Sequence, residues 1–252
     1  MGKTTTAINL ATVLATEHRV LLVDLDPQGN ASTGLGLHPR DRGAGSYALL
    51  LGDSPLAEVI HATGVPNLDL IPSDADLAGA EVELVDTAER EHRLRSAFTA
   101  APEVLRRYDY VFLDCPPSLG LLTLNALVAS QDVLVPLQCE FFALEGVSQI
   151  TQTVERVRRA LNPQLALAGL ILTMHDRRNK LSEAVAVDAR AFFKDKVFET
   201  VIPRNIRISE APSHGLPVTL YDFRSPGAQA YVRLAAEFRR RDRARARRMQ
   251  PA

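Results

Sequence analysis

The sequence has few cysteines and no long apolar segment, and these absences exclude several classes of protein. Only Cys115 and Cys139 occur in 252 residues. Two cysteines are too few for a disulfide scaffold, and neither has a metal-site partner nearby. A reducing compartment is therefore expected. No apolar run reaches the roughly 18 residues of a membrane span, and no basic leader opens the chain, so we expect no membrane segment and no signal peptide. Apolar residues at 46% and charged residues at 23% exclude disorder and collagen.

The formal net charge of −1 conceals an uneven distribution. Residues 239–252 hold seven of the 29 basic residues and one of the 30 acidic ones. This tail therefore carries +6 and the remainder −7. An acidic body with a basic tail favours a polyanionic partner, and a solvated helix end is the alternative on charge alone.

Short apolar runs alternate with longer segments of helical period. The predicted strands are Arg19–Asp24, Leu68–Pro72, Tyr110–Asp114, Asp132–Leu137, Leu167–Thr173 and Val197–Ile202. The predicted helices are Thr4–Thr16, Asp76–Val85, Glu89–Arg107, Leu119–Ser130, Leu144–Leu161, Ser182–Lys194 and Pro226–Arg248. Continuous apolar runs are typical of parallel strands buried on both faces. We expect one α/β domain over residues 1–238, with a mostly parallel sheet covered by helices on both faces, and an arginine-rich tail over residues 239–252.

The start of the chain has the pattern of the end of a phosphate-binding loop. Gly2-Lys3-Thr4 precedes an apolar helix, and in a P-loop the helix amides bind phosphate while the lysine reaches the β and γ phosphates and a threonine ligates Mg²⁺. The four residues Gly2-Lys3-Thr4-Thr5 do not identify a P-loop by themselves, because the upstream strand and the first glycine of the motif are absent.

Two further segments add carboxylates where strands end. Asp24 and Asp26 follow the run ending at Val23, and Asp114 ends the run Val111-Phe112-Leu113. Ligand sites of α/β proteins lie at the carboxyl ends of strands, so Asp26 is placed to orient a water and Asp114 fits the Walker B position near Mg²⁺. For Asp26 the alternative is a strand-ending Asx turn before Pro27.

Four ordered motifs together resemble the ParA/Soj family of chromosome-partitioning ATPases, which belongs to the deviant Walker A class. They are Gly2-Lys3-Thr4-Thr5-Thr6-Ala7-Ile8-Asn9-Leu10, Val23-Asp24-Leu25-Asp26-Pro27-Gln28-Gly29-Asn30, Leu113-Asp114-Cys115-Pro116-Pro117-Ser118 and Ile202-Pro203-Arg204-Asn205. The resemblance runs to about residue 239 and implies a P-loop NTPase fold. It also implies ATP and Mg²⁺ as cofactors.

The resemblance assigns roles to residues of the phosphate site. Gly2, Lys3, Thr4 and Thr5 resemble the phosphate contacts, and Lys3 is also a catalytic candidate. Asp26 matches the aspartate that supports hydrolysis. Metal binding is expected of Thr4, Asp26 and Asp114.

Other residues are assigned to the base and to DNA. Pro203 and Asn205 match residues that bracket adenine, and Met174 follows a strand that also approaches the base, with core packing as its alternative. Non-specific DNA binding in the family uses basic surface residues. The candidates here are Arg177, Arg178, Lys180, Arg204, Arg207 and the arginines of the tail, each with an ordinary solvated charge as the alternative.

The implied activity is a slow, weak ATPase that acts in chromosome or plasmid partitioning. ATP closes a homodimer that binds DNA without sequence preference, and a centromere-binding protein of the ParB type stimulates hydrolysis and releases it. The expected location is the cytoplasm, on the nucleoid, with no membrane partner. A MinD-like spatial regulator is the alternative, but the apolar terminal helix that distinguishes it is lacking. The two cysteines do not fit the spacing of an iron–sulfur cluster loop.

The family pattern also places residues ahead of Met1. A valine normally stands at that position, preceded by a strand and by a second lysine that reaches across the dimer. We therefore expect an incomplete phosphate loop and a missing first strand, with reduced activity of the chain as given. An internal GTG codon taken as the start explains this pattern, and a genuine shortened paralogue is the alternative.

Overall fold

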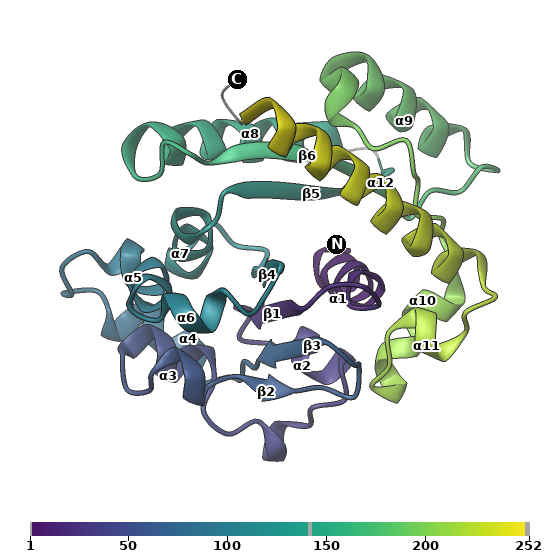
Figure 1. Ribbon diagram of the computed structural model, residues 1–252. Helices are drawn as coiled ribbons and strands as arrows, with labels where there is room; N and C mark the ends of the chain where they lie inside the picture. Colours follow the sequence, from purple (N-terminus) through teal and green to yellow (C-terminus); the bar gives the residue numbers. More distant parts are fainter. Residues whose placement is uncertain (1, 141–142, 250–252) are drawn as a thin grey trace.

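The computed structural model describes residues 2–140 and 143–249, so Met1 and residues 250–252 of the predicted tail lie outside the described residues. Its strands are β1 (Val20–Asp24), β2 (His61–Ala62), β3 (Leu68–Ile71), β4 (Tyr110–Asp114), β5 (Asp132–Gln138) and β6 (Ala166–Thr173). They form one sheet of order β2-β3-β1-β4 and a second sheet of β5 and β6 (Figure 1). Among the strands of the described residues, only β2 pairs antiparallel to its neighbour, so the predicted mostly parallel α/β fold is confirmed.

Helices cover both faces of the four-stranded sheet. On one side lie α1 (Lys3–Leu14), α11 (Val218–Tyr221) and α12 (Pro226–Met249), and on the other lie α3 (Ser46–Leu51), α4 (Leu77–Glu83), α5 (Arg93–Ala100), α6 (Pro102–Leu105) and α7 (Leu121–Ala129) (Figure 1). The remaining helices are α2 (Asn30–Gly34), α8 (Ala143–Ala160), α9 (Lys180–Phe193) and α10 (Ile206–Glu210).

Strand β1 shows why the apolar runs predict a two-sided sheet. Val20 and Leu22 join the core that contains α1 and α12, whereas Leu21 and Val23 join the core beneath α3, α4, α5 and α7. Successive side chains of a strand point to opposite faces, so an unbroken apolar run buries both.

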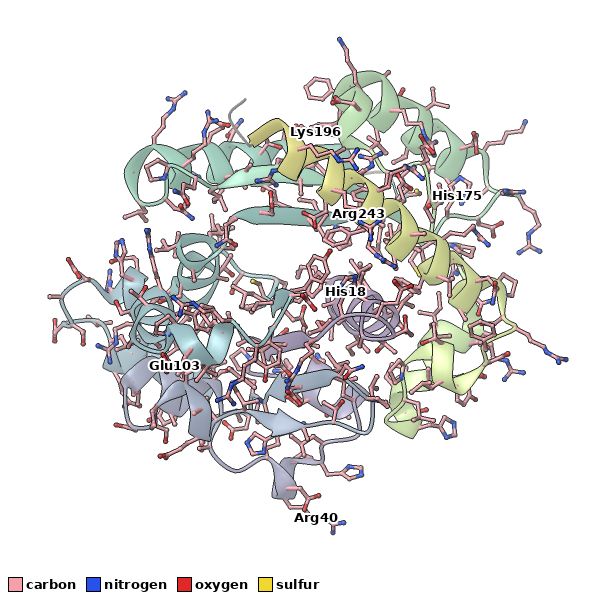
Figure 2. All side chains as sticks on the ribbon, in the orientation of Figure 1. His18, Arg40, Glu103, His175, Lys196 and Arg243 are labelled. Atoms are coloured by element: carbon pink, nitrogen blue, oxygen red, sulfur yellow. The ribbon has the colours of Figure 1, made fainter. Side chains whose placement is uncertain are left out.

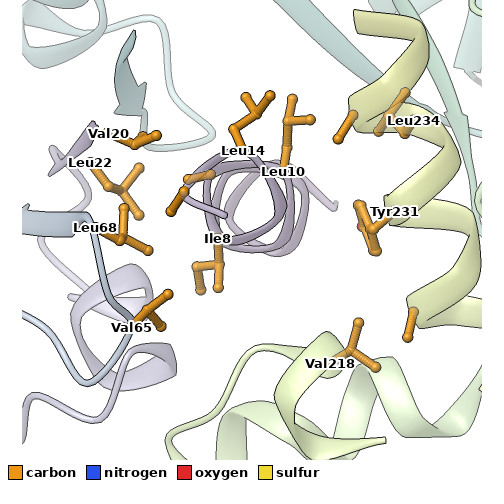
Figure 3. Packing of buried hydrophobic residues seen from close by; sticks show 14 of the residues in the cluster. Ile8, Leu10, Leu14, Val20, Leu22, Val65, Leu68, Val218, Tyr231 and Leu234 are labelled. Carbon is orange, nitrogen blue, oxygen red and sulfur yellow. The ribbon is translucent and has the colours of Figure 1, made fainter. Parts of the chain in front are cut away.

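Helix α1 lies at the centre of the first core. Ile8, Leu10 and Leu14 are almost fully buried, and Figure 3 shows them between the β1 and β3 side chains and those of α12, including Tyr231. The Tyr231 hydroxyl lies 3.4 Å from the Thr6 hydroxyl. The helix that begins the predicted phosphate site is therefore fixed by packing against the last helix of the chain.

The predicted helix Glu89–Arg107 is wrong as one continuous element. It is divided into a short 3₁₀ turn, α5 and α6, with a break at Ala101, where φ is −130° and ψ is 56°. The residue before a proline is sterically disfavoured in the α region, and Pro102 begins the next helix, where no backbone N–H is needed.

The predicted strand Val197–Ile202 is also wrong as a regular strand. The segment runs beside β6, because Phe198 N–H donates to the Leu170 carbonyl and Ile202 N–H to the Leu172 carbonyl, each at 2.8 Å. Among the described residues, the segment forms one isolated bridge, between Val197 and Leu170, and a second bridge follows it at Pro203.

A buried carboxylate explains the interruption. Between those two bonds, the N–H groups of Glu199 and Thr200 both donate to the Glu237 side chain at 2.8 Å. Arg241 pairs with the same carboxylate. Helix α12 thus takes over hydrogen bonds that a regular strand would place in the ladder.

Within the described residues, no backbone ladder joins β4 to β5. Phe112 of β4 and Leu134 of β5 instead pack against the core around α1. The expectation of a further strand ahead of residue 1 stays a prediction.

The arginine-rich tail continues α12 past residue 238, so the predicted boundary falls inside a helix. Several of its charges are paired with the body: Arg239 contacts Glu17, Arg245 contacts Asp132, and Asp242 accepts from the Tyr110 hydroxyl. The apolar face of α12, with Tyr231 and Leu234, is buried in the core. No helix in the described part of the chain combines the length and apolar character that a bilayer crossing requires.

Candidate nucleotide-binding site

The N-terminus of α1 forms the first part of the site. Gly2 precedes the helix with φ at 98°, a left-handed conformation that glycine adopts without strain. The first helical turn then presents Lys3 and Thr4 together with backbone N–H groups that have no intrahelical acceptor. The helix dipole adds positive potential, so this end of α1 suits an anion.

Thr173 approaches the same loop from the end of β6. Its hydroxyl is buried without a hydrogen-bond partner, and a Cβ placed on Gly2 would lie 3.3 Å from it. The hydroxyl therefore faces the loop that precedes α1. The family resemblance places Thr173 and Met174 together at a strand end that approaches the base, and it assigns the base contact to Met174 alone.

Three carboxylates gather opposite the helix end. Asp24 and Asp114 are register partners at the carboxyl ends of β1 and β4, and Asp26 follows two residues later. All three are buried, with 0%, 2% and 7% exposure. The structure therefore brings together the strand ends that the sequence predicts as a site.

Asp114 has free coordinating capacity at one of its carboxylate oxygens. Its Oδ2 atom is buried without a partner. Burial raises the pKa of Asp114 to about 7, and the charges of Asp24 and Asp26 also raise it, whereas a hydrogen bond with Thr4 and the charge of Lys3 lower it. These influences show that all five groups share one site.

Asp24 has a different task, because its carboxylate is already satisfied. It accepts hydrogen bonds from the Ser32 N–H at 2.9 Å, the Ser32 hydroxyl at 2.7 Å and the Asp26 N–H at 3.2 Å. Burial raises the pKa of Asp24. This residue orders the loop that carries Asp26.

The oxygen atoms available here suit Mg²⁺ better than a metal ion that is coordinated entirely by protein side chains. Among the described residues, no three His, Cys, Asp or Glu side chains are close enough to hold a metal. Mg²⁺ is usually bound by one or two carboxylates, with waters and phosphate oxygens completing the shell. The unpartnered Asp114 oxygen beside the Thr4 hydroxyl matches that chemistry.

The residues predicted near a base lie on two adjacent loops. Met174 has a positive φ of 55°, which is strained for a non-glycine residue. Its neighbour His175 pairs with Pro203 in an isolated bridge. The Asn205 side chain accepts from the Arg207 N–H at 3.0 Å and caps α10, so its oxygen is engaged while its amide NH₂ has no partner among the described residues.

A basic hollow of about 380 Å³ lies beside these loops. It is lined by His175, Asp176, Arg177, Arg178, Val201, Pro203, Arg204, Pro226 and Arg233. Figure 2 shows His175 close to α12. The structure therefore unites three of the predicted DNA-binding arginines.

The four arginines of this hollow differ in whether an acidic side chain pairs with them. Arg178 pairs with Asp176 at 3.2 Å, whereas Arg177, Arg204 and Arg233 make no ion pair within residues 2–140 and 143–249. The sequence pattern does not indicate Arg233 as a DNA-binding candidate. This residue lies seven positions after Pro226, so both stand on one face of a helix.

Arg207 lies apart from this hollow. Its guanidinium pairs with Glu210 at 2.9 Å and with Asp222 at 3.4 Å. Two acidic partners neutralise much of its charge, so it is a weaker anion contact than the three unpaired arginines.

Comparison with known sequences gives consistent relatives. A sequence family described as an AAA domain matches residues 1–167. The chromosome partitioning protein ParA of Caulobacter vibrioides is 56% identical over 246 residues, which cover 97% of this chain and 92% of that protein. The sporulation initiation inhibitor protein Soj of Bacillus subtilis is 53% identical over 238 residues, which cover 94% of this chain and 93% of that protein.

Comparison with solved structures gives a neighbour that was solved with a nucleotide analogue. Cobyrinic acid a,c-diamide synthase from Mycobacterium smegmatis, solved with a bound ATP analogue and magnesium, superposes with a TM-score of 0.82 at 37% identity, covering 96% of this chain and 91% of that one. From the relatives, the fold and the convergence of α1, Asp26 and Asp114, the chain belongs to the ParA/Soj family of chromosome-partitioning ATPases.

Proposed function

We propose that this chain is a Mg²⁺-dependent ATPase of DNA partitioning, whose ATP-bound homodimer binds DNA without sequence preference. The observation that carries the proposal is the convergence of the α1 N-terminus, Lys3 and Thr4 with the buried Asp26 and Asp114. The name of the Caulobacter relative, a chromosome partitioning protein, supports the partitioning role.

Each residue of the site has a distinct task in this proposal. The α1 amides and Lys3 bind the phosphates and offset their charge. Thr4, Asp26 and Asp114 would hold Mg²⁺, which would supply charge neutralisation of the phosphates. Asp26 orients the attacking water. Thr5 adds a phosphate contact, while Met174, Pro203 and Asn205 receive the base.

The DNA surface is the hollow lined by Arg177, Arg204 and Arg233. Unpaired arginines bind phosphate oxygens through bidentate hydrogen bonds, and their side chains here come from two loops and α12. A surface that reads only phosphates carries no sequence preference. The proposed place of action is the nucleoid, and the proposed partner for release is a centromere-binding protein of the ParB type.

DNA retardation with ATP, with ADP and without nucleotide tests the function. We expect a shift with ATP and Mg²⁺ only, and addition of a ParB-type partner should raise ATP turnover and abolish the shift. Equal retardation in all three conditions would show that DNA binding is independent of the nucleotide site and would contradict the proposal.

Charge reversals test the DNA surface. Arg233→Glu should weaken DNA binding and reduce the slope of log affinity against log salt by about one phosphate contact or more, each worth about 0.9. Arg95→Glu on α5 is the matched control, because Arg95 is exposed and far from the hollow in the fold. Arg207→Glu should have a smaller effect than Arg233→Glu. Equal slopes for Arg233→Glu and Arg95→Glu would place the DNA surface elsewhere.

A further inference from the structure

Arg42 is a buried arginine that no assigned function uses. It is 4% exposed and lies on the loop between residues 37 and 45. Among the described residues, no carboxylate lies within ion-pair distance of its guanidinium, which is unusual because buried charges in proteins are generally paired.

Its hydrogen bonds go instead to oxygens from separate segments. The Nε atom donates to the Leu37 carbonyl at 3.3 Å, and Nη1 donates to the Ser73 carbonyl at 2.5 Å. The Nη2 atom donates to the Gly29 carbonyl at 3.2 Å and to the Thr33 hydroxyl at 2.8 Å. The guanidinium thereby joins the loop after β1, helix α2 and the loop after β3.

These partners are the ones that hold Asp26. The Ser73 hydroxyl donates to the Asp26 carbonyl at 2.8 Å, and the Gly29 N–H donates to the same oxygen at 2.8 Å. Ser73 N–H also donates to the Ser32 hydroxyl, which in turn donates to Asp24. The Asp26 carbonyl thus accepts hydrogen bonds from Ser73 and Gly29, and the carbonyls of these two residues in turn accept from Arg42.

Gly29 shows how closely the arginine approaches this loop. Its φ is 60°, and a Cβ at this position would lie 2.1 Å from Arg42 Nη1 and 2.7 Å from the Ser73 carbonyl oxygen. Only a glycine accommodates both the left-handed backbone and the guanidinium. Gly29 and Arg42 therefore form one unit: the glycine leaves room for Nη1, which donates to Ser73, while Nη2 of the same guanidinium donates to the Gly29 carbonyl.

We propose that Arg42 is a positioning residue for ATP hydrolysis, which fixes the Asp26 loop against the end of β3. This inference rests on the proposed ATPase function and adds a residue outside the nucleotide contacts. Because the planar guanidinium donates in three directions at once, a lysine at this position cannot replace its set of bonds. Loss of the arginine should therefore loosen Asp26 while leaving the α1 phosphate contacts in place.

The test compares Arg42→Met and Arg42→Lys in the full chain with Arg40→Met as the matched control. Arg40 lies on the same segment but is exposed at its outer tip (Figure 2). For both Arg42 variants we expect kcat to fall by about 10- to 100-fold, as for a small displacement of a catalytic group, with the Kd for ATP changed less than about twofold. Arg40→Met should retain the parental kcat.

A double variant separates positioning from general destabilisation. In an Asp26→Ala background, Arg42→Lys should not lower the residual single-turnover rate further, because residues that act as a unit are not additive. Parental kcat in Arg42→Lys would overturn the inference. So would a parallel loss of ATP affinity, or an equal further loss of rate in the Asp26→Ala background.

Failure of the proposed function has a different signature. If the parental chain shows no ATP turnover, or if Asp26→Ala turns over ATP at the parental rate, the hydrolysis assignment itself fails, and the Arg42 inference fails with it. If Asp26→Ala slows turnover but Arg42→Lys does not, the ATPase function stands and only the Arg42 inference is overturned.

Discussion

Replacing Asp114 by Asn should stabilise the protein in the absence of Mg²⁺ and nucleotide while removing their binding. The pKa of Asp114 rises from 3.8 to about 7 because the carboxyl is buried and lies beside Asp24 and Asp26. A pKa raised in the folded state means that the folded protein holds its proton better than the unfolded one. The associated stability is therefore present below about pH 4 and is lost as the pH rises through about 7.

The size of this destabilisation follows from the two pKa values of Asp114, in the unfolded and in the folded state. Each pH unit between 3.8 and about 7 corresponds to about 1.4 kcal/mol, so ionised Asp114 costs about 4 kcal/mol at pH 8. Asn has the same shape and no charge. Recovery of even half of this energy raises Tm by about 4 to 8 °C for a chain of this length.

Thermal unfolding followed by circular dichroism measures the effect. At pH 8 without ligands, Asp114→Asn should unfold at a higher temperature than the parent, and at pH 5 the difference should shrink to less than half. With Mg²⁺ and ATP at about 100 times Kd, the parent should gain about 2.7 kcal/mol and the variant much less. A variant no more stable than the parent at pH 8, or a difference independent of pH, would refute the reasoning.

Three further predictions follow from the described contacts. Lys3→Ala should abolish ATP binding by calorimetry and every later step, and ATP-dependent DNA retardation by this variant would contradict the role of Lys3. Asp26→Ala should keep ATP binding but block phosphate release, whereas parental turnover would remove Asp26 from the hydrolysis step. Glu237→Ala should lower the free energy of unfolding by about 2 to 4 kcal/mol in urea denaturation, because it leaves the Glu199 and Thr200 N–H groups without an acceptor. Glu237→Gln should cost less, and equal stability of the parent and the alanine variant would contradict the account of that carboxylate.

The sequence predicts the site best where local chemistry and strand ends coincide. Lys3 and Thr4 stand at a helix start, and Asp26 and Asp114 follow apolar runs that become neighbouring parallel strands. Because the carboxyl ends of parallel strands meet at one edge, pattern alone brings these residues together.

Residues that act through tertiary contacts could not be found in this way. Arg42 lies in a polar loop that resembles any solvated segment, and only the fold shows that its guanidinium is buried between two strand ends. Glu237 looks like an exposed helix residue in the sequence, yet it binds the backbone of Glu199 and Thr200 and interrupts a predicted strand. Arg207 has the right charge for DNA, but its acidic partner Asp222 lies 15 residues away in the chain.

The packing of α1 against α12 has a consequence for synthesis of the protein. The Thr6 and Tyr231 hydroxyls that meet in this contact are separated by 225 positions in the chain. Loop closure over such a distance is entropically costly and slows folding. While the protein emerges from the ribosome, strands β1 and β3 can cover one side of α1 early, but the side that packs against α12 stays unburied until the last helix is made. Chaperones that bind apolar helices therefore have a long opportunity to bind this side of α1.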